Sequence, residues 1–140
     1  MTVHLIKLAV GAKDPGDVAA FQQRLLAHAG RVFHRTRQMP KRATDITDGG
    51  SLYWVVAGII SLRQRILAIE DALRDDGAKA ADLVLDPTLI AVHPRAARAF
   101  QGWRYLAPND APNDADAKTT AATGALPPDM RRELARLGLL

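Results

Sequence analysis

The hydrophobic pattern of the first thirty residues changes from strand-like to helical. Residues 3–10 carry mostly β-branched and aliphatic side chains, which predicts a strand. Residues 15–29 repeat apolar positions at helical spacing, which predicts a helix. Asp14 and Gly30 flank this segment, and we place the helix boundaries there because these residue types cap the amino and carboxyl ends of helices.

The next segment mixes apolar and cationic residues. Residues 32–39 have strand character and end at Pro40, but alternation leaves neither face cleanly apolar. A strand of this kind lies at the edge of a sheet or lines a site. Residues 41–47 predict one or two helical turns anchored by Ile46, and the Asp-Gly-Gly sequence at 48–50 predicts a tight turn.

The longest apolar run of the chain follows this turn. Residues 52–57 are rich in β-branched and aromatic side chains and predict a strand. Residues 59–69 fit two patterns, because apolar spacings of three and four favour a helix, whereas alternation over 60–66 favours a strand. Further short strands are predicted over residues 82–85, 89–93 and 100–106.

The last third changes in composition. Residues 107–126 are rich in Ala, Asp, Thr and Pro without apolar periodicity, which predicts a flexible linker after a single domain over residues 1–106. Residues 127–140 bring back a helical pattern, with Met130, Leu134 and Leu137 on one face. We expect this C-terminal helix to pack on the domain, on a partner protein or on a second copy of the chain.

The composition is that of a globular protein with a cationic surface. Its 140 residues are 48% hydrophobic, which is sufficient for one domain with a core. The net charge of +4 favours binding of phosphates, nucleic acid or other anions. The absence of cysteine excludes disulfides, thiolate zinc sites and cysteine nucleophiles.

Nothing in the hydropathy of the chain predicts a membrane association. The first residues lack the basic region of a signal peptide. The apolar run over residues 52–62 is far shorter than the ~20 residues that span a bilayer. We therefore expect a soluble, cytoplasmic protein with no membrane partner.

Five sequence blocks carry a family resemblance: VFHRTRQMPKR, DGGSLYWVVAGII, LRQRIL, LVLDP and FQGWRYL. In this order they resemble an uncharacterised bacterial family, domain of unknown function 1489, over about residues 3–110. The linker and the final helix lie outside the resemblance. The family implies no catalytic residue, substrate or cofactor, but it favours a strand for residues 59–69.

The order of the predicted elements is also similar to that of PUA-like domains, including the ASCH and EVE groups. Residues 48–54 would enter the barrel of such a domain, and Gly58 would turn the chain back into residues 59–69. The likeness implies an α+β fold, a small, mostly antiparallel β-barrel with a flanking N-terminal helix and a C-terminal helix after a linker. PUA-like domains commonly bind RNA or read modified bases, which is an argument from fold alone.

An acid-free run over residues 30–44 is the strongest functional signal. Arginine grips phosphate through two parallel hydrogen bonds, and alternation brings Arg35 and Arg37 to the same side of a strand. A solvated cationic face, paired with the acidic residues of segment 70–76, explains the run equally well. The candidate phosphate-binding residues are Arg35, Arg37, Lys41 and Arg42.

Residues 100–106 provide an aromatic counterpart. Trp103 and Tyr105 share one face of the predicted strand, with Arg104 opposite, and aromatic rings with arginine are used to stack and hold unpaired bases. The same residues are somewhat better explained as an aromatic plug that closes the end of the barrel. Trp54 we assign to the core.

Enzymatic alternatives have less support in the sequence. Some ASCH-type amidohydrolases use a lysine, a threonine and a glutamate, and Lys41, Thr44 and Glu70 are the candidates here, although the surrounding residues do not match that group's motif. The histidines show no metal-ligand spacing, so neither a metal nor a cofactor is predicted.

The sequence leads to one main hypothesis and two alternatives. The main hypothesis is non-enzymatic binding of RNA, or of another nucleotide-containing polyanion, in a basic cleft. The phosphates would contact the four cationic candidates, and a base would contact Trp103, Arg104 and Tyr105. The alternatives are a small amidohydrolase acting on a modified nucleoside or other small amide, and a protein-interaction module.

Overall fold

A computed structural model describes residues 1–98 and 100–115 of the chain. The order of elements is β1 (His4–Leu8), α1 (Pro15–Ala29), β2 (Val32–Thr36), α2 (Ala43–Thr47), β3 (Ser51–Val56), β4 (Ile59–Leu73), β5 (Lys79–Leu85), β6 (Ile90–Ala96), β7 (Trp103–Leu106) and a 3₁₀ turn (Pro108–Asp110). None of the helices in this part of the chain is long and apolar enough to cross a membrane.

The strands form one mixed sheet with two free ends. Its order is β2-β5-β4-β3-β1-β7, and β6 pairs with β4 outside this path. The β1–β3 pair is parallel, whereas the other pairs of named strands are antiparallel. The α+β class and the mostly antiparallel sheet are confirmed, but the predicted closed barrel is wrong, because β2 and β7 end the sheet without pairing to each other. The PUA-like likeness is not confirmed.

Strand β4 gives the sheet its curvature and settles the ambiguous segment in favour of a strand. Its first part pairs with β3 and β6 and its second part with β5, and the register shifts between Ile60 and Leu62 and between Ile66 and Ala68. A bulge inserts one residue and moves later side chains to the other face. Ile66 and Ile69 therefore contact the same core cluster although they are three positions apart in the sequence. This bulge explains why the apolar residues of β4 have a helix-like spacing in the sequence.

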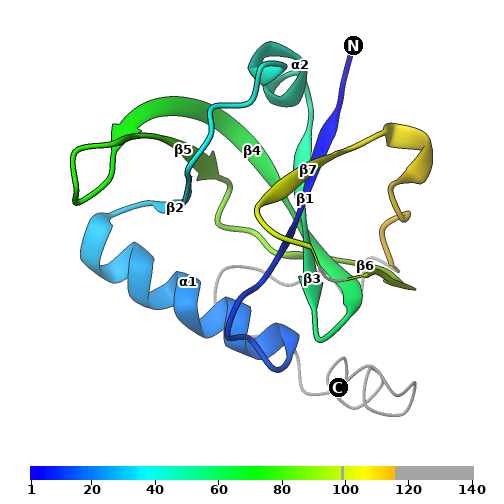
Figure 1. Ribbon diagram of the computed structural model, residues 1–140. Helices are drawn as coiled ribbons and strands as arrows, with labels where there is room; N and C mark the ends of the chain where they lie inside the picture. The colour runs from blue at the N-terminus through cyan, green and yellow to red at the C-terminus, as the bar shows by residue number, and fades with distance from the viewer. Residues whose placement is uncertain (99, 116–140) are drawn as a thin grey trace.

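The core lies on both faces of the central strands. Trp54 belongs to the larger buried cluster, whereas its neighbours Tyr53 and Val55 belong to the smaller one. This division follows from the alternation of side chains along a strand, and it explains why β3 is buried throughout. Helix α1 runs along one side of the sheet (Figure 1) and adds Val18 and Ala19 to the larger cluster.

Helix α1 has the predicted boundaries and caps. The side chain of Asp14 accepts a hydrogen bond from the backbone N–H of Asp17 at 3.0 Å. Gly30 adopts a left-handed φ of 76°, and its N–H donates to the carbonyl of Leu26 at 2.9 Å. Both ends of the helix thus pair backbone groups that would otherwise lack a partner.

Two tight turns constrain the main chain. The β3–β4 hairpin has a two-residue loop in which Ala57 and Gly58 both have positive φ, 50° and 82°, a geometry that usually selects Asn-Gly. Gly50 lies where α2, β1 and β3 converge, and a Cβ there would collide with the carbonyl oxygens of Val3 and Ile46. Glycine at position 50 is therefore required by close approach of the backbone.

The predicted linker is packed on the sheet at its start. Asp114 bridges to Val92, and the N–H of Ala115 donates to the carbonyl of Ala91 at 2.9 Å. The guanidinium of Arg63 binds both carboxylate oxygens of Asp114, at 2.6 and 2.7 Å. The segment predicted as a linker thus contacts the sheet at residues 113–115. The rest of the predicted linker and the C-terminal helix with Met130, Leu134 and Leu137 lie outside the described residues.

Candidate functional site

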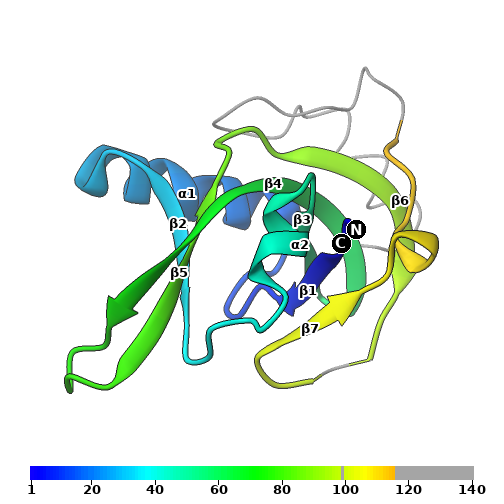
Figure 2. The same ribbon diagram turned by 90° about the horizontal axis from the view of Figure 1, so that it is seen from above.

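The two end strands of the sheet border a hollow of about 730 Å³. Because the sheet curls, β2 and β7 face each other across this opening (Figure 2). The lining is polar and cationic on the β2 side, with an indole on the β7 side. It consists of Lys7, His34, Arg35, Thr36, Arg37, Gln38, Gln101, Gly102 and Trp103.

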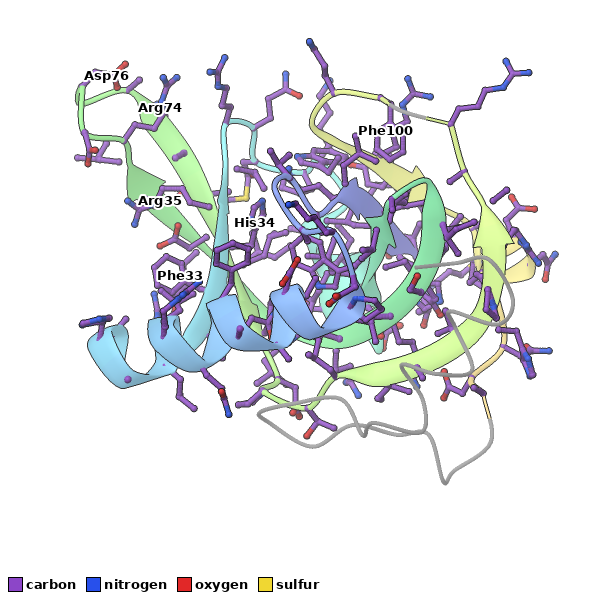
Figure 3. All side chains as sticks on the ribbon, turned by 90° about the horizontal axis from the view of Figure 1, so that it is seen from below. Phe33, His34, Arg35, Arg74, Asp76 and Phe100 are labelled. Atoms are coloured by element: carbon purple, nitrogen blue, oxygen red, sulfur yellow. The ribbon has the colours of Figure 1, made fainter. Side chains whose placement is uncertain are left out.

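Successive residues of β2 point in opposite directions. Figure 3 shows His34 directed toward the body and Arg35 directed toward the β4–β5 hairpin. The ring of His34 meets that of Trp54 edge to face, with centroids 5.4 Å apart. Arg35 donates to both carboxylate oxygens of the buried Asp82, at 2.7 and 3.0 Å, and to the carbonyl of Leu73 at 3.1 Å. The hydrogen bond to Asp82 raises the pKa of Arg35, and the carboxylate of Asp82 largely offsets the positive charge of the guanidinium.

Two other cations supply the positive charge of the hollow. Arg37 follows the end of β2, is exposed, and makes no ion pair within residues 1–98 and 100–115. Lys7 projects from β1, and its partial burial lowers the pKa of its ammonium group. Lys7 likewise forms no ion pair within these ranges. An anion entering the hollow would find both groups available for direct contact.

His34 carries a buried polar atom that has no partner. Its Nε2 is shielded from solvent and makes no hydrogen bond within the described residues. Burial, helped by the charge of Lys7 and opposed by Asp82, lowers the pKa of His34 to about 4. The ring is therefore neutral at pH 7, and no described residue satisfies the hydrogen-bonding capacity of Nε2. An unsatisfied buried group of this kind costs roughly 1–3 kcal/mol of stability.

Trp103 forms the opposite wall of the hollow. Its Nε1 donates to the carbonyl of Gln38 at 3.3 Å, which spans the gap between β7 and the end of β2. Its ring meets Tyr105 edge to face at 5.0 Å. The hydroxyl of Tyr105 in turn accepts a hydrogen bond from the backbone N–H of Arg42 at 3.1 Å. Tyr105 thus anchors the segment before α2 and does not line the hollow.

The structure brings together some of the predicted residues. Arg35, Arg37 and Trp103 line one hollow, as the sequence hypothesis requires. Arg42 pairs with Asp45 at 3.0 Å, and Arg104 lies over the ring of Phe100 at 4.9 Å. The predicted residues that do not line the hollow are Lys41, Arg42, Arg104 and Tyr105.

Sequence reasoning missed Lys7 and His34. Lys7 interrupts an otherwise apolar strand, and this interruption was the available signal. For His34 the signal was the strand face without a clean apolar pattern. The sequence did not identify Thr36, Gln38, Gln101 or Gly102 either.

The candidates for amide hydrolysis lie apart from this hollow. Glu70, on the second half of β4, pairs with Arg31 at 2.9 Å. Neither Glu70 nor Lys41 nor Thr44 lines the hollow between β2 and β7. Among the residues that the structure describes, no group of three or more His, Asp or Glu side chains could hold a metal ion.

Comparison with known proteins identifies a family. Searches of curated proteins and of solved structures found no significant match. One family pattern matches residues 5–140, so it extends beyond residue 110, where the resemblance was expected to end, and includes the last 30 residues. The chain belongs to the family described as "Protein of unknown function (DUF1489)".

Proposed function

We propose that this protein binds RNA, or another nucleotide-containing polyanion, in the hollow between β2 and β7, without catalysing a reaction. The main support for this proposal is the set of side chains on the two walls of the hollow. Lys7 and Arg37 provide cations without ion-pair partners among the described residues, and Trp103 provides an aromatic ring opposite them.

The chemistry of the walls matches an unpaired strand. Phosphates contribute most of the affinity in such complexes, and arginine and lysine are their usual partners. The indole of Trp103 gives a surface against which one base can stack. A duplex would keep its bases stacked inside, so it would make no use of this ring. We therefore expect a single-stranded segment to bind more tightly than a duplex of the same length.

The pairing of Arg35 reduces the expected number of phosphate contacts. Since Asp82 engages this guanidinium through two hydrogen bonds, the cations of the hollow without an ion-pair partner among the described residues are Lys7 and Arg37. For a single strand each contact contributes about 0.7 to the slope of log K against log salt. Two contacts predict a slope of about −1.4.

A salt titration of binding tests the proposal. The affinity for single-stranded RNA is measured by filter binding or fluorescence anisotropy at several salt concentrations. Arg37→Ala should reduce the magnitude of the slope by about 0.7. Arg65→Ala serves as the matched control, because Arg65 is an exposed arginine of β4 that does not line the hollow. Its slope should equal that of the unmodified protein.

Two results would contradict this function. One is the absence of binding at low salt, and the other is an equal loss of slope in the Arg37 and Arg65 variants. The second result would mean that the net charge of the protein attracts RNA without a specific site.

A further inference from the structure

A second hollow of about 220 Å³ adjoins the first and shares Lys7 and His34 with it. It lies between α1, the end of β1 and β2. Its lining is mostly apolar, in contrast to the cationic hollow. Phe21, Leu25 and Trp54 are among the apolar residues that line it.

The wall formed by Trp54 is rigid. Its Nε1 donates to Oε1 of the fully buried Gln64 at 2.8 Å. Gln64 also exchanges two hydrogen bonds with Gln22, at 2.6 and 2.7 Å, and donates to the carbonyl of Asp86 at 3.0 Å. The polar groups of Trp54, Gln22 and Gln64 are therefore engaged with one another. Within the described residues, the buried side-chain atom that lacks a hydrogen-bond partner is Nε2 of His34, and His34 is one of the residues that line this hollow.

The size of the second hollow suits one ring system. An apolar cavity of about 150 Å³ accepts benzene, so 220 Å³ accommodates one or two fused rings. The aromatic residues Phe21 and Trp54 line it, and rings pack favourably against rings. An aliphatic chain of similar volume would leave Nε2 of His34 unpaired. A heterocycle with polar atoms on its edge would pair this nitrogen.

We propose that the second hollow receives one nucleobase of the bound polyanion, with its edge hydrogen-bonded to Nε2 of His34 and its phosphate held in the first hollow by Lys7 and Arg37. This inference rests on the proposed function and names the part of the ligand that each hollow recognises. Lys7 and His34 lie on the shared wall, where base and phosphate of one nucleotide would meet.

The test compares two strands that differ only in their bases. One is a single-stranded RNA of about eight nucleotides, and the other is an abasic strand with the same number of phosphates. Insertion of a base should make the complete strand bind about 5- to 100-fold more tightly, of which stacking on Trp103 accounts for a part. Variants of residues that line the second hollow then distinguish insertion of a base there from stacking of a base on Trp103.

Two variants close or alter the second hollow. Leu25→Trp fills it from α1, and His34→Phe keeps a ring against Trp54 but removes the hydrogen-bonding nitrogen. Each should lower the affinity for the complete strand at least about fivefold and leave that for the abasic strand unchanged. Gln23→Trp is the control, because Gln23 is exposed on the same helix and does not line this hollow.

The outcomes distinguish the two proposals. Equal affinity of both variants and the control for the complete strand, with an intact salt slope, would overturn the base pocket and leave the phosphate site standing. Loss of binding to both strands in the Leu25 and His34 variants would also overturn it, because the phosphate contacts would then have been damaged. Failure of the unmodified protein to bind either strand would overturn the proposed function and this inference together.

Discussion

Lowering the pH from 7 to 4.5 should destabilise the protein through His34. Its pKa in the folded state is about 4, against 6.5 for an unperturbed histidine. Between these values the unfolded chain binds a proton at His34 that the folded chain does not. The free energy of unfolding therefore falls as the pH falls through this window, with a slope of up to about 1.4 kcal/mol per pH unit.

The magnitude follows from the two pKa values. Taking 6.5 and 4, the loss assigned to His34 between pH 7 and pH 4.5 is about 2 kcal/mol. The groups around the ring explain the direction. Burial against Trp54 and the charge of Lys7 disfavour the imidazolium, whereas Asp82 favours it with a smaller effect.

Urea denaturation at the two pH values measures this loss. His4 contributes in the same window, since burial and Arg63 also lower its pKa. The comparison is therefore between the unmodified protein and His34→Phe, in which the His4 contribution remains. The variant should lose about 2 kcal/mol less than the unmodified protein on acidification. Equal losses, or an NMR titration of the His34 ring near pH 6.5, would refute the reasoning.

Three further substitutions test the fold by thermal or urea denaturation. Ala57→Asn should stabilise the protein by about 0.5–1 kcal/mol, since asparagine tolerates a positive φ better than alanine; no gain would contradict the turn geometry. Gly50→Ala should cost roughly 3 kcal/mol or more or prevent folding, because backbone atoms occupy the space of its Cβ. Gln64→Leu should cost roughly 2–4 kcal/mol, because Trp54 Nε1 and the Gln22 amide would lose partners; a neutral effect would contradict the network.

Local chemistry made most of the secondary structure predictable. The caps at Asp14 and Gly30 determine the ends of α1, and β-branched and aromatic residues identify β3. The difficult segment was β4, because its bulge after Ile66 gives three-residue spacing between core contacts. A bulge depends on pairing between strands, so periodicity along one strand does not reveal it. The closed barrel was wrong for a related reason, since closure depends on how the two end strands meet.

The candidate site was predictable to the extent that it follows one strand. Alternation along β2 and the cationic run led to Arg35 and Arg37, and the aromatic segment led to Trp103. The partner of Arg35 is Asp82 on β5, and the position of Lys7 depends on β1 lying beside β7. These neighbours come from the topology of the sheet. Contacts between residues this far apart leave no pattern that can be recognised in a single sequence.

A substitution that removes one polar atom should increase stability if Nε2 of His34 is reserved for a ligand. Nε2 has no partner within residues 1–98 and 100–115, and hollows border the ring, so phenylalanine fits there without overpacking. His34→Phe should raise the free energy of unfolding at pH 7 by about 1 kcal/mol. The matched substitution is His4→Phe, because His4 also packs edge to face on an aromatic ring, at 5.1 Å from Tyr53.

The two histidines differ in their hydrogen bonds. Nδ1 of His4 accepts from the backbone N–H of Ser51 at 3.0 Å, so His4→Phe leaves this buried donor unpaired. It should therefore lower the free energy of unfolding by roughly 1–2 kcal/mol, opposite in sign to the change at His34. Urea denaturation at pH 7 measures both. If His34→Phe were as destabilising as His4→Phe, Nε2 of His34 would have a structural partner, and the argument that it is reserved for a nucleobase would fail.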